Sequence, residues 1–280
     1  MGYIEIISLI FLGALGAVFG SFACCQAWRI HEGKLGSRSI CLHCKKQLKW
    51  YDNIPVFSWL VLRGKCRFCK KPIGVAEILS ETSLAATFVI FGFLFFTHSF
   101  PFQYQNVEFI VSLVPLVLLL VLTVVFWILM IYDAKWSEMP TKLLVAANVV
   151  AVLYFIAHNI VACLDAGTFA FDVVWQGALF ETFLGFAILA GTYYLLYVFS
   201  KEKWVGSGDW IVCSAISIAL GGWALAIAEL FFANLLALIC ALPGVITKKQ
   251  KQIPFAPFLI IAFVIVIAFL YTFTSRFLKF

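Results

Sequence analysis

Long apolar runs alternate with short polar segments along the 280 residues of the chain. A helix needs roughly 17 to 25 predominantly apolar residues to cross the hydrocarbon core of a membrane, so the pattern predicts about eight membrane-spanning helices. They lie approximately over residues 4–28, 78–97, 108–131, 143–163, 175–199, 210–227, 229–246 and 255–275. The boundary between the sixth and seventh is the weakest, because Gly221 and Gly222, followed by Glu229, are the only interruption in one apolar stretch.

The composition supports this interpretation. Apolar residues make up 64% of the chain and charged residues 12%, and the mean hydropathy is +1.03. A soluble fold of this composition would expose large apolar patches, which excludes cytosolic enzymes, disordered tails and secreted disulfide domains. The first apolar run has no basic region before it, so we expect it to be retained as a helix and not removed as a signal peptide. The expected fold class is an all-α polytopic membrane protein.

Basic residues concentrate in the polar segment between the first two predicted helices. This segment, residues 29–77, holds eleven of the twenty Lys and Arg residues of the chain. Cytoplasmic loops carry an excess of Lys and Arg, so the segment is predicted to face the cytoplasm. Eight alternating helices then place eighteen of the twenty basic residues on that side, with Arg276 and Lys279 outside. The net charge of +6 is thus an orientation signal, and we expect no nucleic-acid partner.

Two CxxC pairs lie in this polar segment, and twenty-one residues separate them. Their cysteines are Cys41, Cys44, Cys66 and Cys69. Two such pairs can close a tetrahedral shell of four thiolates with no open position, which is typical of a structural zinc ion. Two disulfides or a redox thiol pair are the alternatives, but a reducing cytoplasm argues against the first and the matched pairs argue against the second. The other cysteines are predicted to be apolar packing residues: Cys24, Cys25, Cys163, Cys213 and Cys240.

Two aspartates occur at the cytoplasmic ends of predicted helices. Asp133 ends the third helix and Pro140 follows seven residues later, whereas Asp209 closes a GxGD tetrapeptide that opens the sixth helix. Ionisable residues in membrane segments are costly and are functional candidates by default. Two aspartates at one depth are what an aspartic protease needs, because an ionised carboxylate takes a proton from water while a protonated one polarises the scissile carbonyl.

Several nearby residues are candidates for a supporting role. Gly206 and Gly208, in the GxGD tetrapeptide, would let the backbone pass close to a substrate. Pro140 would start the helix after Asp133, and Glu81 would support the site. The alternative is that Asp133 and Asp209 are ordinary charges at helix ends, with Asp209 as a helix N-cap. Two further acidic residues in apolar sequence, Glu181 and Glu229, are expected to be interhelical hydrogen-bond partners or interfacial residues.

Several motifs occur in the order found in bacterial type IV prepilin peptidases. They are Gly20-Ser21-Phe22, the two CxxC pairs with Trp50-Tyr51-Asp52-Asn53-Ile54-Pro55 between them, Asp133 with Pro140, the GxGD ending in Asp209, and Pro254-Phe255-Ala256-Pro257-Phe258. The chain resembles this family of GxGD-type membrane aspartic proteases. The resemblance implies that Asp133 and Asp209 are catalytic and that the leader of type IV prepilins or pseudopilins is cleaved at the cytoplasmic face. It also implies methylation of the new N-terminal residue with S-adenosylmethionine, in the bacterial cytoplasmic (inner) membrane.

Three positions depart from the family pattern. Cys24 stands where the family usually has Asn, Thr141 where Asp follows the proline, and Ile211 where Lys follows the GxGD aspartate by two residues. None of these changes removes a candidate catalytic aspartate, although the change at Cys24 bears on methylation. We therefore expect three parts: the first transmembrane helix over 1–28, a cytoplasmic zinc-binding domain over 29–77 associated with methyl transfer, and a peptidase core over 78–280.

Other functions remain open at this point. Two alternatives are enzymes: a peptidase without methyltransferase activity and a presenilin-like intramembrane protease. Two others are not enzymes: a carboxylate-lined transporter and an inactive assembly factor. The CxxC pairs and the spacing between Asp133 and Pro140 favour the prepilin peptidase. A transporter would be expected to carry its carboxylates near the bilayer midplane and to contain an inverted repeat, and neither is visible in the sequence.

Overall fold

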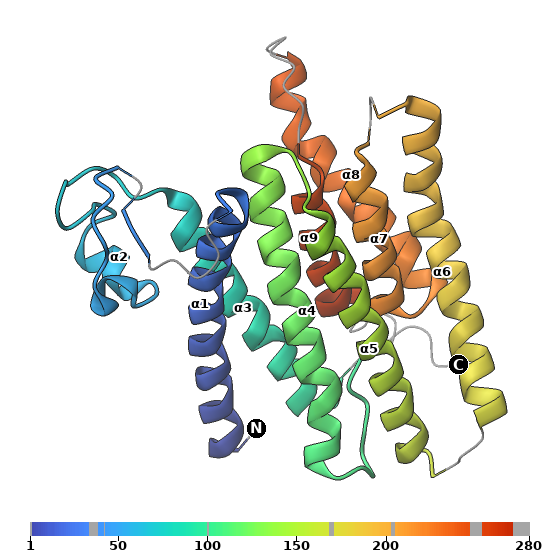
Figure 1. Cartoon of the computed structure of the whole chain (residues 1–280). Helices are drawn as coiled ribbons and strands as arrows, with labels where there is room; N and C mark the ends of the chain where they lie inside the picture. The colour runs from blue at the N-terminus through green and yellow to red at the C-terminus, as the bar shows by residue number, and fades with distance from the viewer. Residues whose placement is uncertain are drawn as a thin grey trace. The chain divides into compact units, whose positions relative to one another are not determined.

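A computed structural model of the chain describes residues 2–33, 39–41, 43–99, 101–167, 171–202, 205–246 and 254–270. Helices dominate this part of the chain (Figure 1). Within it, β-structure is limited to two isolated bridges, between Ile40 and Gln47 and between Lys65 and Pro72. The chain divides into two compact units, Met1–Phe93 and Leu94–Phe280.

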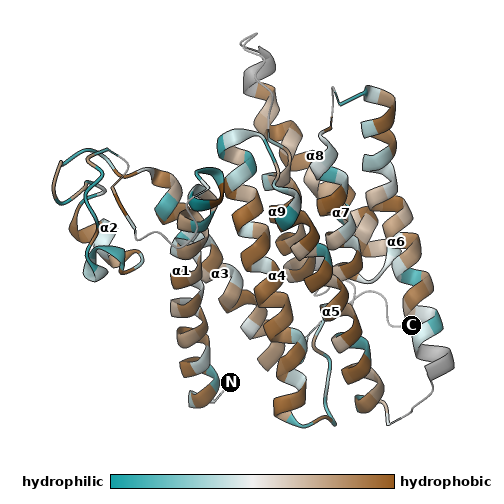
Figure 2. Ribbon diagram, in the orientation of Figure 1, coloured by the Kyte–Doolittle hydropathy of each residue, from teal (hydrophilic) through white to brown (hydrophobic). Residues whose placement is uncertain are grey.

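Among the described residues, six helices are long and apolar enough to cross a membrane. They are α1 (Tyr3–His31), α3 (Val75–Phe96), α4 (Phe109–Trp136), α5 (Thr141–Asp165), α6 (Phe171–Ser200) and α8 (Trp223–Ile246). Two shorter apolar helices are α7 (Ser207–Leu220) and α9 (Ala256–Ile265), and α9 continues as the π-helix η2 (Val266–Leu270). Figure 2 shows that hydrophobic residues cover most of the length of these helices. The eight apolar helices fall on the eight predicted segments, which confirms a multi-pass, all-helical membrane protein.

The long apolar stretch between Asp209 and Ile246 is divided at its glycines. α7 ends at Leu220, and Gly221 takes a φ of +70° while its N–H donates to the Ser217 carbonyl at 3.1 Å. A left-handed backbone of this kind favours glycine and is a common way to end a helix. The break lies about two turns before the predicted end of the sixth segment at residue 227. With 14 residues, α7 is about 21 Å long and shorter than a hydrocarbon core.

In the first unit, α1 and α3 pack backbone against backbone. A Cβ atom added at Gly16 or Gly20 would lie only 2.8 or 2.6 Å from the Cα atom of a residue in α3. At the same contact, the Ser80 hydroxyl donates to the Gly20 carbonyl at 2.9 Å. Small residues four apart allow such close packing between membrane helices, where polar contacts replace a hydrophobic driving force. The helices that lead into and out of the polar segment are therefore fixed to each other.

The second unit is a bundle of α4 to α9. α5 packs against both α4 and α7, and α9 also packs against both. In the core, Phe126 of α4 meets Phe263 of α9 edge to face, with ring centroids 5.5 Å apart. Because α5 and α9 both contact α4 and α7, they hold the two helices that carry Asp133 and Asp209 at fixed positions.

Candidate active site and metal centre

Asp133 lies in the last turn of α4, and its side chain is buried. The helix ends at Trp136, and the next residue, Ser137, adopts a left-handed conformation and donates its N–H to the Asp133 carbonyl at 2.8 Å. One carboxyl oxygen, Oδ2, accepts the backbone N–H of Ala256 at 3.1 Å. Ala256 is the first residue of α9, so the Asp133 carboxyl satisfies one of the free N–H groups at the start of that helix.

Asp209 is the third residue of α7 and is as deeply buried as Asp133, with 5% of each residue exposed. Its Oδ2 accepts the Gly206 N–H at 2.9 Å, and Gly206, not Asp209, is the N-cap. The hydrogen bond at the start of the helix therefore accounts for one carboxyl oxygen of Asp209, Oδ2. The other oxygen, Oδ1, is buried and has no hydrogen-bond partner within the described part of the chain. Such unsatisfied polar atoms are uncommon in folded proteins and require an explanation.

The structure brings the two aspartates together. Their carboxyl groups are close enough for their charges to interact. The loop before α5 also touches the first turn of α7, because a Cβ added at Gly208 would lie 2.6 Å from Sδ and 2.9 Å from Cβ of Met139. Met139 directly precedes Pro140, which is the N-cap of α5. The candidate residues of the peptidase core thus gather where the loop between α4 and α5 meets the start of α7.

Sequence reasoning missed a polar bridge between α5 and α7. The Asn148 side-chain N–H donates to the Ile211 carbonyl at 3.1 Å, and its Oδ1 accepts the Ser214 hydroxyl at 2.6 Å. An Asn in an apolar helix was the available signal, because polar side chains there usually bond to a neighbouring helix. The bridge fixes α7 next to α5 within two turns of Asp209. The Ala256 N–H was also missed, because a backbone donor leaves no mark in the sequence.

Glu229 lies in α8 and is fully buried. Neither of its carboxyl oxygens has a hydrogen-bond partner among the residues described here. It is close enough to interact electrostatically with Tyr193 of α6 and Cys213 of α7. Glu181, by contrast, is half-buried on α6. The expected role of Glu229 as an interhelical hydrogen-bond partner is therefore not seen in the described part of the chain.

The four cysteines of the two CxxC pairs form one cluster. Their Sγ atoms all lie within 4.8 Å of one another, and those of Cys41 and Cys69 are 3.9 Å apart. Four thiolates placed tetrahedrally at about 2.3 Å from zinc would be about 3.8 Å apart. The cluster could therefore hold a metal ion with little movement. Both pairs reach it through the same turn, in which the first cysteine exchanges backbone hydrogen bonds with the residues four and five positions later.

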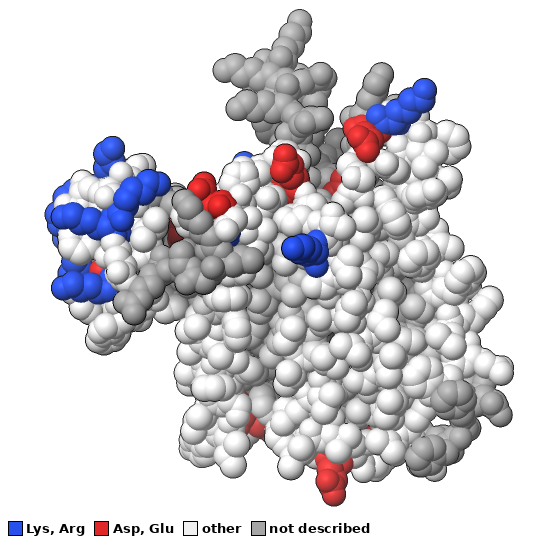
Figure 3. Space-filling model, viewed as in Figure 1, with Lys and Arg blue, Asp and Glu red and all other residues white. Residues whose placement is uncertain are grey.

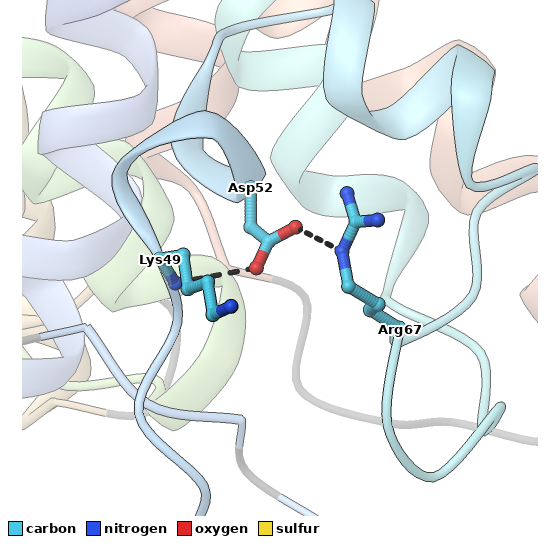
Figure 4. Close-up of polar contacts among 3 residues, drawn as sticks. All are labelled: Lys49, Asp52 and Arg67. Carbon is cyan, nitrogen blue, oxygen red and sulfur yellow. Dashed lines mark hydrogen bonds and ion pairs between the residues drawn. The ribbon is translucent and has the colours of Figure 1, made fainter.

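An ion pair links the second CxxC pair to the segment after the first (Figure 4). The Asp52 carboxylate accepts the Lys49 backbone N–H at 3.2 Å and the Arg67 Nε–H at 2.7 Å. The Arg67 guanidinium also lies over the Tyr51 ring, 4.9 Å from its centroid. Because the Asp52 side chain is only 2% exposed, this pair is better shielded from water than an ordinary surface ion pair.

Positive charge surrounds the cluster. Lys and Arg gather on the surface of the polar segment, around α2 (Phe57–Val61) (Figure 3). A hydrogen bond from the Lys71 backbone lowers the pKa of the Cys69 thiol, but desolvation and the three neighbouring thiols outweigh it and raise this pKa to about 11. A metal ion binds thiolates, so it must displace protons from this cluster. The surrounding cations would offset the negative charge of a metal held by four thiolates.

Glu81 anchors the polar segment to α3. Its Oε2 accepts the Val56 N–H at 2.7 Å. Val56 has φ +60° and ψ −51°, and the Phe57 N–H donates to the Pro55 carbonyl across it, which makes a strained γ-turn. A left-handed conformation at a β-branched residue costs about 1–3 kcal/mol and persists only where its surroundings hold it. The structure thus places Glu81 next to the cysteine-containing segment, in a different unit from Asp133 and Asp209.

Replacing Glu81 with Leu should release this turn. The Val56 N–H would lose its acceptor, which costs about 1–3 kcal/mol, so amide exchange over residues 54–60 should accelerate by about tenfold or more. Glu81→Gln is the matched control, because it keeps an oxygen at the same place and should retain most of the protection. Hydrogen exchange followed by mass spectrometry measures both variants. Unchanged protection in Glu81→Leu would show that the contact does not hold the turn.

Comparison with known proteins shows what the chain is similar to. The family model of the bacterial peptidase A24 N-terminal domain matches residues 14–95. Curated proteins named prepilin leader peptidase/N-methyltransferase match far more of the chain. One from Dichelobacter nodosus is 29% identical over 80% of this chain and 68% of its own length. One from Vibrio cholerae is 24% identical over 94% of this chain and 97% of its own length.

The chain resembles members of the prepilin leader peptidase/N-methyltransferase family over most of its length. A further member, from Bacillus subtilis, is 26% identical over 90% of this chain and 89% of its own length. No solved structure matches the chain. The family model covers most of α1, the segment with the four cysteines and nearly all of α3, which together make up most of the first unit.

The three departures from the family pattern have distinct places in this structure. Cys24 is buried in α1, and its thiol faces the Ala76 carbonyl of the first turn of α3 at 3.8 Å. Thr141 is an exposed residue at the start of α5. Ile211 contributes its carbonyl to the Asn148 bridge. The hydrogen bonds that Asp133 and Asp209 accept come from backbone N–H groups, so none of the three substitutions removes them.

Proposed function

We propose that this chain cleaves the leader peptide of type IV prepilins or pseudopilins by means of Asp133 and Asp209, at the cytoplasmic face of a bacterial membrane, and then methylates the new N-terminal residue. The names of its relatives support both activities. The observation that carries the peptidase assignment is the pair of buried carboxyl groups at the ends of two separate helices, close enough for the charge of Asp133 to act on Asp209. The unpaired Oδ1 of Asp209 supports it further, because a buried acceptor that the fold does not satisfy is available to a water molecule.

Hydrolysis by this pair requires one proton shared between two carboxyl groups. The ionised carboxylate takes a proton from a water molecule, whose oxygen bonds to the scissile carbonyl carbon, while the protonated carboxyl gives its proton to the carbonyl oxygen. The resulting diol collapses as the C–N bond breaks. The departing nitrogen takes the proton held by the first carboxyl, and a diol hydroxyl returns a proton to the second. Backbone donors from Ala256 and Gly206 hold one oxygen of each carboxyl in place.

The domain assignment follows from the same proposal. Residues 1–28 form a membrane helix, residues 29–77 a cytoplasmic zinc-binding domain associated with methyl transfer, and residues 78–280 the peptidase core. Cys41, Cys44, Cys66 and Cys69 would hold zinc in a closed shell, where the ion orders the loop and takes no part in hydrolysis. S-adenosylmethionine would supply the methyl group. The cytoplasmic orientation rests on the excess of Lys and Arg in residues 29–77.

The substrate class matches the position of the aspartates. A prepilin carries a short basic leader before an apolar helix, so its helix can lie among membrane spans while the leader junction reaches the helix ends. Asp133 lies in the last turn of α4 and Asp209 in the first turn of α7. These are opposite ends of helices that run in opposite directions, and both are reached from one side of the membrane.

Mass spectrometry of a co-expressed prepilin tests the proposal. Leader removal and addition of a methyl group are separate mass changes, so one spectrum reports both activities. A prepilin that keeps its leader beside well-expressed chain would contradict the peptidase assignment. A cleaved but unmethylated pilin would favour a peptidase without methyltransferase activity, and the Cys24 substitution for the usual Asn is the observation that motivates this second candidate.

Gly208→Ala should reduce leader cleavage about tenfold. Its Cβ would clash with Sδ and Cβ of Met139 and would push the first turn of α7, which carries Asp209, away from the loop before α5. A displacement of about 1 Å at a catalytic group is enough for a loss of this size or larger. Met139→Ala removes the sulfur and the Cγ atom but keeps Cβ, so the double variant Gly208→Ala/Met139→Ala should recover part of the lost activity. Equal loss in the single and double variants would rule out this clash as the cause.

A further inference from the structure

The cysteine-containing segment carries an apolar stripe that the first unit leaves exposed. The stripe consists of Phe57, Leu60 and Val61 on the short helix α2, and each of these residues is 58–63% exposed. Positions i, i+3 and i+4 share one face of a helix, so the three side chains form a continuous surface. The opposite face is packed, since Trp59 closes over Gly64, where an added Cβ would lie 2.9 Å from the ring. α2 is therefore amphipathic with its apolar face outward.

The hydrogen bond between Val56 and Glu81 fixes the level of α2 along the membrane normal. Glu81 lies six residues after Val75, the first residue of α3, which corresponds to about 9 Å along the helix. The Val56 N–H contacts its carboxyl at 2.7 Å, and α2 begins at the next residue. Val75 and Leu79, at the same end of α3, are themselves more than 60% exposed and apolar. Exposed apolar side chains therefore occur both on α2 and at the end of the membrane helix to which its start is bonded.

The chain also returns to the membrane at both ends of this segment. It leaves α1 at His31 and enters α3 at Val75, and these helices are packed together. Between residues 39 and 76 it carries eight Lys and Arg residues, all exposed, and one acidic residue, Asp52, which is already paired with Arg67. Basic residues close to a membrane surface are attracted by anionic lipid headgroups. The positive charge and the apolar stripe therefore both favour a membrane surface that contains anionic lipid.

We propose that the stripe Phe57, Leu60 and Val61 is an interfacial membrane anchor, which inserts into the headgroup region of the bilayer while the adjacent Lys and Arg residues bind anionic phospholipid. An interfacial helix lies in the plane of the membrane and buries its apolar face about 5–10 Å into the boundary between headgroups and acyl chains. The anchor would hold the four-cysteine cluster against the membrane surface. It is independent of the peptide chemistry proposed above.

Photo-cross-linking in lipid nanodiscs tests this anchor with the full chain. The photoreactive residue p-benzoylphenylalanine replaces Leu60 in one protein and Gln47, an exposed polar position of the first CxxC turn, in the control. Each is placed in discs of phosphatidylcholine with or without phosphatidylglycerol. We expect lipid adducts at position 60 to exceed those at position 47 several-fold, and to increase when phosphatidylglycerol is present. Adducts to another part of the chain, or none, would overturn the proposal, and equal yields in both lipids would overturn the anionic preference.

A second measurement tests the anchor without the photoreactive label, in case the labelled protein misfolds. The variant Phe57→Ser/Leu60→Ser/Val61→Ser removes the apolar stripe but leaves all four cysteines and the Val56 contact. Amide exchange over residues 50–61 in discs should become several-fold faster than in the original chain, at unchanged metal content. Asn53→Ser, at an exposed polar position before α2, is the matched control and should leave exchange unchanged. Equal exchange in the stripe variant and in the original chain would overturn the anchor.

Discussion

Asp133→Asn or Asp209→Asn should lower leader cleavage by about 10³-fold or more, because an amide can neither take a proton from water nor donate one to the substrate carbonyl. Asn keeps an oxygen that can accept the backbone N–H of Ala256 or Gly206, so the fold should be preserved. Leader cleavage by membranes that contain equal amounts of each variant measures the effect. The double variant should be about as inactive as either single one, since residues that act as a unit do not contribute additively.

Glu138→Gln is the matched control for these variants. It makes the same chemical change at an exposed carboxyl in the loop after α4 and should cleave at the original rate. A mature pilin offered to the Asp133 and Asp209 variants should still be methylated if methyl transfer has a separate site. Near-normal cleavage by either variant would remove that residue from the mechanism and leave it as a charge at a helix end.

Cys66→Ser should release the metal from a protein that otherwise contains about one zinc ion per chain. Binding of structural zinc by four thiolates is worth about 10–16 kcal/mol of folding free energy, so losing one of four ligands should also unfold the loop. Cys163→Ser, a partly buried cysteine outside the cluster, is the matched control and should keep the zinc. Elemental analysis of freshly reduced protein measures the content. The absence of zinc from the original chain would overturn the assignment.

The same variant should lose methylation more completely than cleavage. The cluster lies in the first unit, whereas Asp133 and Asp209 lie in the second and are held by contacts within it. Methylated and unmethylated pilin, measured by mass spectrometry beside the uncleaved precursor, separate the two effects. Equal loss of both activities from a protein that remains folded would show that the loop is needed for peptide hydrolysis as well.

The sequence alone predicted the features that depend on local composition or short spacing. Eight apolar segments predicted eight apolar helices, because burial in lipid is decided residue by residue along each helix. The two CxxC pairs predicted a cluster of Cys41, Cys44, Cys66 and Cys69, because each turn brings two thiols together and only one further contact is needed. Gly221 and Gly222 gave the right place for the break after α7, although the predicted helix ran beyond it.

Long-range features were decided by the tertiary structure. Asp133 meets the N–H of a residue 123 positions later, and Gly208 packs against Met139 on a different loop. A sequence pattern does not specify which helices become neighbours, since the side chains that face lipid and those that face protein are equally apolar. Nor does the sequence reveal the orientation of α2. Its stripe faces outward because the Trp59 ring packs against Gly64 and the Val56 N–H donates to Glu81. The sequence shows which single residues can do chemistry, but packing among the helices decides which of these residues can act together.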